Sequence, residues 1–137
     1  MILHPAVMVH GLDHGRMALQ YSRPATLVSA PGAASFGGCL WWHAMVEHLR
    51  REFPLVEFSA ILDCADSPGQ AMAALRVGER RLVLDPRCPA FATVSAVAAP
   101  LGATILERAP PALDLGFPGA AWHLDAWLRG DRTVPVS

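Results

Sequence analysis

The sequence predicts an α/β protein: a single domain with a five-stranded, mostly parallel sheet and helices on both faces, in a flavodoxin-like three-layer arrangement. Short apolar runs alternate with segments of helical periodicity along the 137 residues, a pattern typical of successive βα units. The last three runs end about 22 residues apart, enough for one strand and one crossover helix each. Five runs are therefore interpreted as strands, at residues 6–10, 25–30, 57–63, 81–85 and 103–107.

Residues that favour helix caps mark the segments between these strands. Ser67 is expected to be an N-cap, followed by Pro68 at the first helical position and by Gln70, a capping-box residue, at the third. Gly78 then ends that helix. The longest helix is expected over about 38–53, because its apolar residues fall on one face at helical spacing.

The chain length suits one domain and leaves little room for two independent cores. We expect residues 1–108 to form the α/β domain. Residues 109–137 read as a Pro-rich connection and a C-terminal helix, around 120–129, that packs on the same domain. In that helix Ala120, Ala121, Leu124, Trp127 and Leu128 share the inner face, whereas Trp122 lies on the opposite face.

Composition restricts the classes of function. All 11 basic residues are Arg, so chemistry that needs a lysine is excluded, including Schiff-base aldolases and P-loop phosphate binding. A net charge of -1 gives no attraction for nucleic acid or an anionic membrane. The hydrophobic fraction of 53% exceeds what a monomer of this size readily buries. A homodimer is therefore expected, with Trp122 among its contacts.

The sequence favours a soluble, cytoplasmic protein. The start of the chain lacks the basic region and cleavage site of a secretory signal. The longest uncharged run, 88–106, is interrupted by proline and glycine, which argues against a membrane span. The three cysteines, Cys39, Cys64 and Cys88, follow no zinc or redox spacing, and their odd number argues against a disulfide framework.

Polar and glycine-rich loops follow the predicted strands. Ligands bind parallel sheets at the carboxyl ends of the strands, in the loops that lead to the next helices. Those loops therefore define the candidate ligand site at one edge of the sheet. The predicted ligand-binding residues are Ser35, Gly37, Gly38, Cys39, Asp63, Asp85 and Arg87.

Each part of this site has a second, structural interpretation. The Gly-rich stretch 32–39 could cradle an anion with free backbone N–H groups, or it could simply allow a tight turn against the sheet. Its spacing matches neither the dinucleotide fingerprint nor the P-loop. The cysteines could supply a reactive thiol, with Cys39 the most accessible, or fill the core. Asp63 and Asp85 could act as bases or cap loop N–H groups.

His10 and His14 lie four residues apart and would share a face only within one helix. Because residue 10 is expected to end a strand, we interpret the pair as residues that cap and hydrogen-bond a turn. No metal site is predicted from them.

Two functional hypotheses follow. The first is a small-molecule site, for example for a phosphorylated or carboxylate compound, at the carboxyl edge of the sheet. The second is a non-enzymatic homo-oligomeric or protein-interaction module, in which the apolar excess serves subunit contacts. No motif names a reaction, a catalytic residue or a cofactor, so the sequence leaves open whether the protein is an enzyme.

Overall fold

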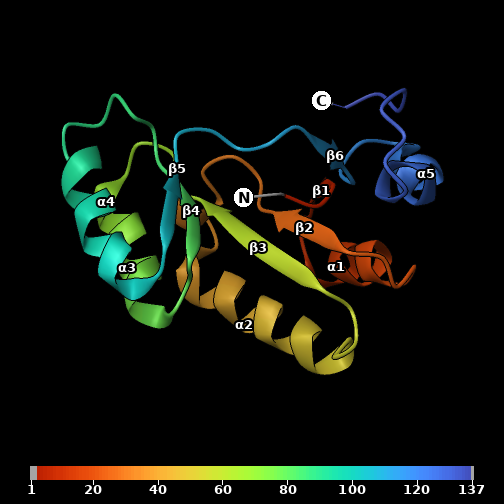
Figure 1. Cartoon of the computed structure of the whole chain (residues 1–137), viewed down its shortest axis with the longest axis horizontal. Coiled ribbons are helices and arrows are strands. Elements are labelled where there is room, and N and C mark those ends of the chain that lie inside the picture. Colours follow the sequence, from red (N-terminus) through yellow and green to blue (C-terminus); the bar gives the residue numbers. More distant parts are fainter. Residues whose placement is uncertain (1–2, 137) are drawn as a thin grey trace. The chain divides into compact units, whose positions relative to one another are not determined.

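The structure is a computed structural model that describes residues 3–136. Within these residues, strands and helices alternate along most of the chain (Figure 1). The strands are β1 (Ala6–Met8), β2 (Ala25–Val28), β3 (Phe58–Asp63), β4 (Arg81–Val83), β5 (Thr104–Leu106) and β6 (Ala112–Asp114). The α-helices are α1 (Leu12–Leu19), α2 (Gly38–Glu52), α3 (Pro68–Val77), α4 (Phe91–Ala98) and α5 (Leu124–Leu128). Three 3₁₀-helices accompany them: η1 (Ala33–Ser35), η2 (Ala99–Leu101) and η3 (Ala120–His123).

The strands form one sheet in the order β5-β4-β3-β2-β1-β6. β1 pairs in parallel with β2 and β6, and β4 pairs in parallel with β3 and β5. The α/β class and the parallel sheet predicted from the sequence are therefore confirmed. The predicted number of five strands is wrong, because β6 is a sixth. It was missed because it has only three residues and follows Pro110 and Pro111, which are typical of a connection.

The chain divides into two compact units. The first unit comprises Met1–Val28, Met45–Ala60 and Pro110–Ser137. The second unit comprises Ser29–Ala44 and Ile61–Ala109.

In the first unit, Met8 of β1 is in register with Val28 of β2 on one side and with Asp114 of β6 on the other. Gly15 of α1 approaches Leu49 of α2 so closely that a Cβ added to the glycine would lie 2.5 Å from Leu49 Cδ1. The close contact between these two segments therefore depends on the absence of a side chain at residue 15. The fully buried core of this unit includes Val7, Leu19, Leu27, Leu49 and Leu124.

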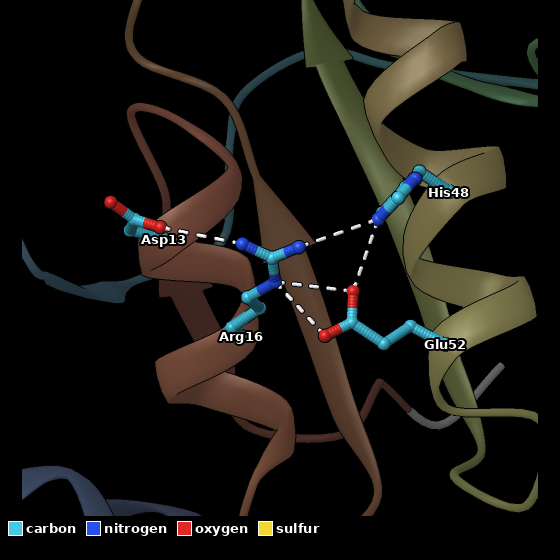
Figure 2. A network of polar contacts seen from close by, with 4 residues as sticks. All are labelled: Asp13, Arg16, His48 and Glu52. Carbon is cyan, nitrogen blue, oxygen red and sulfur yellow. Dashed lines mark hydrogen bonds and ion pairs between the residues drawn. The ribbon is translucent and has the colours of Figure 1, made fainter.

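A polar network on the surface of the first unit joins α1 to α2 (Figure 2). Arg16 Nε donates hydrogen bonds to Glu52 Oε1 at 2.9 Å and to Oε2 at 3.1 Å. His48 Nε2 lies 3.1 Å from Glu52 Oε2, and Asp13 Oδ1 lies 3.6 Å from Arg16 Nη1. The hydrogen bond from Arg16 lowers the pKa of Glu52 and raises that of the guanidinium.

The C-terminal part of the first unit matches the predicted division of faces in its helix, except at Ala121, which is exposed. Residues 120–123 form the 3₁₀-helix η3 and the α-helix begins only at Leu124, so the spacing of an α-helix does not hold before that residue. Leu124, Trp127 and Leu128 are buried, whereas Trp122 is 90% exposed. Trp127 Nε1 donates a hydrogen bond of 2.7 Å to the carbonyl of Ala6 at the start of β1. This bond gives the buried indole N–H a partner, as burial of a polar group requires.

In the second unit, Asp63 at the end of β3 is in register with Val83, and Val83 is in register with Leu106 of β5. The carboxyl ends of three neighbouring strands therefore meet at one edge. The N-cap predicted for α3 is confirmed, since Ser67 Oγ accepts the backbone N–H of Gln70 at 3.2 Å. The return bond of a capping box, to the Gln70 side chain, is not found in the described part of the chain, because the Ser67 N–H donates to the carbonyl of Cys64 at 3.0 Å. Gly78 ends the helix with a φ of 108°, in the left-handed region that favours glycine.

No helix within residues 3–136 combines the length and the apolar character needed to cross a lipid bilayer.

Candidate functional site

A cleft of about 870 Å³ lies within the second unit, at the carboxyl edge of β3, β4 and β5. Four of the predicted site residues line it: Ser35, Asp63, Asp85 and Arg87. The other lining residues are Pro31, Gly32, Phe36, Ala65, Asp66, Val83, Pro86, Glu107, Arg108 and Ala109. Binding sites in parallel sheets form at the carboxyl ends of the strands, and this sheet has a cleft at that place.

Asp63 is the most buried charged residue of the cleft, with 8% of its surface exposed. Its Oδ1 atom accepts two backbone N–H groups, from Ala65 at 2.8 Å and from Gly32 at 3.2 Å. Its own backbone N–H donates to Ser29 Oγ at 2.9 Å. No hydrogen bond to the second carboxylate oxygen, Oδ2, is found within residues 3–136. Oδ1 therefore holds the backbone of two loops in place, while Oδ2 can accept a hydrogen bond from a ligand.

Asp85 and Arg87, which also line the cleft, form a local ion pair. The guanidinium donates from Nη2 to Asp85 Oδ2 at 2.8 Å and from Nε to Oδ1 at 3.1 Å. The backbone N–H of Arg87 also donates to Oδ1 at 2.9 Å. These bonds lower the pKa of the Asp85 carboxyl to about 2, the side-chain bond from Arg87 contributing most. Both oxygens of Asp85 are therefore already engaged.

Two residues of the cleft have positive φ angles. Gly32 has a φ of 70°, which glycine adopts without strain. Ala65 has a φ of 50°, which costs a residue with a Cβ roughly 1–2 kcal/mol. The Ala65 conformation is held at both ends of the residue, since its N–H donates to Asp63 and its carbonyl accepts the N–H of Asp85 at 2.8 Å. Backbone strain that the surroundings maintain in this way often accompanies a binding site.

The charges that line the cleft are unequal. Asp63, Asp66, Asp85 and Glu107 supply four carboxylates, whereas Arg87 and Arg108 supply two guanidinium groups. The cleft therefore has an excess of negative charge, and Arg87 is already paired with Asp85. This balance disfavours a free anion and favours a ligand that donates hydrogen bonds or is positively charged.

Three predicted site residues do not line the cleft: Gly37, Gly38 and Cys39. They follow η1, which ends at Ser35, and the turn at residues 36–37 leads the chain into α2. A Cβ on Gly37 would lie 2.9 Å from Trp41 Cε3, and Gly38 has a φ of 81°. Both glycines thus have a steric or conformational reason to be glycine, as the tight-turn interpretation of this stretch states.

Sequence reasoning missed Glu107 and Arg108, which line the cleft directly after β5. The signal was present, because these residues follow a predicted strand in the same way as Asp63 and Asp85 do. Phe36 was missed for a different reason. An aromatic residue in a loop suggests burial, yet this side chain is 86% exposed at the rim.

The cysteines lie in the second unit and none of the three lines the cleft. Cys64 is fully buried, and burial is the main factor that raises the pKa of its thiol to about 12. Cys39, expected to be the most accessible, is only 7% exposed, whereas Cys88 is partly exposed. A thiolate at Cys64 is therefore unfavourable, in line with the interpretation of this residue as a core filler. Within residues 3–136, no group of three or more potential metal-ligating side chains is found.

His10 and His14 lie in the first unit, and only His14 is helical. The backbone N–H of His10 donates to His14 Nδ1 at 3.1 Å. This is the turn-type hydrogen bond expected from the sequence. Because Nδ1 accepts, the neutral His14 ring carries its proton on Nε2.

Comparison of the chain with protein-family models and with curated proteins finds no match.

Proposed function

We propose that the protein binds a small polar molecule in the cleft of the second unit. The observation that supports this proposal best is Asp63, a nearly buried carboxylate with one oxygen committed to the fold and the other free of protein partners within the described chain. Oδ2 keeps contact with solvent, so a ligand can reach it and donate a charge-assisted hydrogen bond to it. The proposal concerns binding and includes no reaction.

The charge balance favours a cationic amine over the phosphorylated or carboxylate compound suggested by the sequence. The negative excess of the cleft attracts a positive group, and Asp63 Oδ2 offers it an acceptor. An anion would have to compete with Asp85 for Arg87. Arg108 alone offers little compensation, since three further carboxylates line the same space.

Calorimetric titration with putrescine, a small diamine, and with inorganic phosphate tests the proposal. We expect putrescine to bind and phosphate not to bind. Asp63→Asn is the decisive variant, because the amide oxygen can still accept the N–H groups of Gly32 and Ala65 while an NH₂ group replaces Oδ2. The variant should lose about tenfold or more in affinity, the value of one charge-assisted hydrogen bond.

Asp13→Asn is the matched control, since it makes the same change of charge on an exposed side chain of the first unit. It should leave affinity unchanged. Binding of phosphate with Asp63→Asn unaffected would contradict the amine assignment. Binding of neither probe would leave the cleft without support as a site for small charged ligands.

A homodimer is the second candidate function, and one specific observation favours it. Trp122 is 90% exposed, Phe117 is 56% exposed and Leu55 is 97% exposed, all in the first unit. Large exposed apolar side chains are typical of subunit contacts. Sedimentation of the wild type and of Trp122→Ala tests this: a monomeric wild type excludes the dimer. A dimer unchanged in the variant excludes Trp122 from the interface.

We further propose that the protein works in the cytoplasm and does not bind nucleic acid. Its three cysteines are free, as a reducing compartment would keep them. The 11 arginines are balanced by 12 acidic residues, so no net positive field attracts phosphate backbones. Fractionation of cells expressing the tagged protein, and a filter-binding assay at low salt, test the two statements.

A further inference from the structure

A pocket of about 420 Å³ lies in the first unit. Its lining comes from residues 3–6, which lead into β1, and from the two prolines that precede β6. Trp127 of α5 and three residues of the segment that follows this helix complete the lining. The volume falls within the range of about 300–1,000 Å³ that is typical of small-molecule sites. The pocket is therefore large enough to take a small organic ligand.

The walls of this pocket are apolar and offer few hydrogen-bond donors. Three of the lining residues are prolines, which have no backbone N–H: Pro5, Pro110 and Pro111. The indole N–H of Trp127 already donates to the carbonyl of Ala6. Valine side chains at positions 134 and 136 add aliphatic surface. The body of a ligand that suits these walls is therefore apolar.

The positive charge of the pocket comes from Arg132, which is one of its lining residues. Its Cζ atom lies 5.3 Å from the centroid of the Trp127 ring, a cation–π contact with another lining residue. Within residues 3–136, Arg132 makes no ion pair with a carboxylate. The neighbouring Asp131 instead accepts the backbone N–H and the hydroxyl of Thr133, at 2.9 Å and 2.7 Å. The guanidinium of Arg132 can therefore bind an anion without losing a protein partner.

The lining also lacks negative charge, since it contains no acidic residue among those that the structure describes. Its other titratable residue is His4, whose Nε2 atom lies 3.3 Å from Oε1 of Glu57, a residue outside the lining. The planar guanidinium group matches the two oxygens of a carboxylate. One guanidinium balances one negative charge, which favours a carboxylate over a phosphate group with nearly two charges.

We propose that the first unit holds a second ligand site, for a small carboxylic acid with an aromatic or branched aliphatic body. The carboxylate binds Arg132, and the body packs against Trp127 and the three prolines of the lining. The cation–π contact already positions the guanidinium, which lowers the entropic cost of binding. The proposal concerns binding alone, and its site lies in the first unit, whereas the amine cleft lies in the second.

Calorimetric titration with cinnamate tests the proposal. Cinnamamide is the matched probe, because it has the same aromatic body and no charge. We expect cinnamate to bind about tenfold more tightly than cinnamamide, the value of one hydrogen bond to a charged group. Equal affinities for the two probes, or no binding of cinnamate, would overturn the proposal.

Arg132→Gln removes the charge and keeps a side chain that can donate a hydrogen bond. The affinity for cinnamate should fall about tenfold, to that of cinnamamide, while the affinity for cinnamamide stays unchanged. Arg129→Gln is the matched control, because it removes the charge of an exposed arginine that pairs with Asp125 and does not line the pocket. Asp63→Asn should also bind cinnamate like the wild type, so the two proposed sites can fail separately.

Val136→Asp locates the binding site within the first unit. Val136 lines the pocket but is 43% exposed, so the fold should tolerate a polar residue there. The new carboxylate should compete for Arg132 and weaken cinnamate about tenfold, with little effect on cinnamamide. Leu55→Asp, at a residue that is 97% exposed and outside the lining, is the control. Cinnamate affinity that survives Arg132→Gln or Val136→Asp, or that falls equally in the control variants, would contradict the assignment.

Discussion

Gly15 of α1 packs against Leu49 of α2 with no room for a side chain: a Cβ on the glycine would lie 2.5 Å from Cδ1 of the leucine. Leu49 has no exposed surface, so its side chain has little room to move away. An exposed glycine in a helix would gain about 1 kcal/mol of stability on replacement by alanine, but overpacking a core costs about 1–3 kcal/mol. We therefore expect Gly15→Ala to destabilise the protein by about 1 kcal/mol.

Urea unfolding measures this change. Gly69→Ala is the matched control, because nothing lies within 4 Å of a Cβ at that position of α3. It should be neutral or slightly stabilising. In a Leu49→Ala background the clash disappears, so Gly15→Ala should cost less there than in the wild type. A Gly15→Ala variant as stable as Gly69→Ala would show that the two segments are not in close contact.

The network of Figure 2 should stabilise the first unit only when salt is low. Arg16 and Glu52 are partly exposed, and ions screen exposed pairs. Glu52→Gln should lower the midpoint of thermal unfolding slightly in dilute buffer, and the difference should vanish in about 1 M NaCl. Glu47→Gln, which changes an exposed acid of the same helix, is the control. A salt-independent effect of Glu52→Gln would mean that packing, not charge, joins α1 to α2.

The ion pair between Asp85 and Arg87 should appear in the acid dependence of stability. The folded state lowers the pKa of Asp85 from its ordinary 3.8 to about 2, so the carboxylate contributes stability above pH 3.8. That contribution is lost as the pH falls through the folded value, because protonation ends the attraction to Arg87. The stability difference between the wild type and Asp85→Asn should therefore be constant near neutral pH and disappear near pH 2. Urea midpoints measured between these limits check it, and a difference that grows toward low pH would contradict it.

The three thiols should react at very different rates in the native protein. Cys88 is partly exposed, whereas Cys39 and Cys64 are buried and the pKa of Cys64 is raised to about 12. A thiol-specific chromogenic reagent near neutral pH should label one cysteine quickly and the other two only on unfolding. Cys88→Ala should abolish the fast phase, whereas Cys39→Ala should retain it. A fast phase that persists in Cys88→Ala would place a reactive thiol elsewhere.

Much of the architecture could be predicted because local chemistry decides it. Apolar runs located β1 to β5 to within a few residues, and the sequence of Ser67, Pro68 and Gly78 defined α3 at both ends. β6 could not be predicted, since three residues after two prolines form a strand only because β1 offers them an unpaired edge. The strand order is likewise a property of tertiary pairing and left no local signal.

The candidate site was predictable only as an edge of the sheet. Ligands bind parallel sheets at the carboxyl ends of the strands, and on this ground Asp63 and Asp85 were predicted as site residues. Both line the cleft. This reasoning could not foresee that residues 37–39 lie outside the cleft, nor that Ala65 takes a positive φ next to Asp63. The Ala65 conformation is held in part by a contact that is distant in sequence, since its carbonyl accepts the N–H of Asp85. The bond from Gly32 to Asp63 likewise joins two loops that are 31 residues apart. The pocket beside Arg132 was hidden for the same reason, because it joins residues 3–6 to residues beyond 109.

The hydrogen bond from Trp127 to Ala6 spans 121 positions of the chain and has a consequence for biosynthesis. On the ribosome, β1 emerges long before β6 and α5 are translated. The edge of β1 that pairs with β6 in the folded protein is therefore unpaired until late in translation. An uncovered strand edge is a template for pairing with other chains. The nascent polypeptide should therefore be most vulnerable to aggregation late in translation. A stop codon just before residue 110 should direct the product to inclusion bodies or proteolysis.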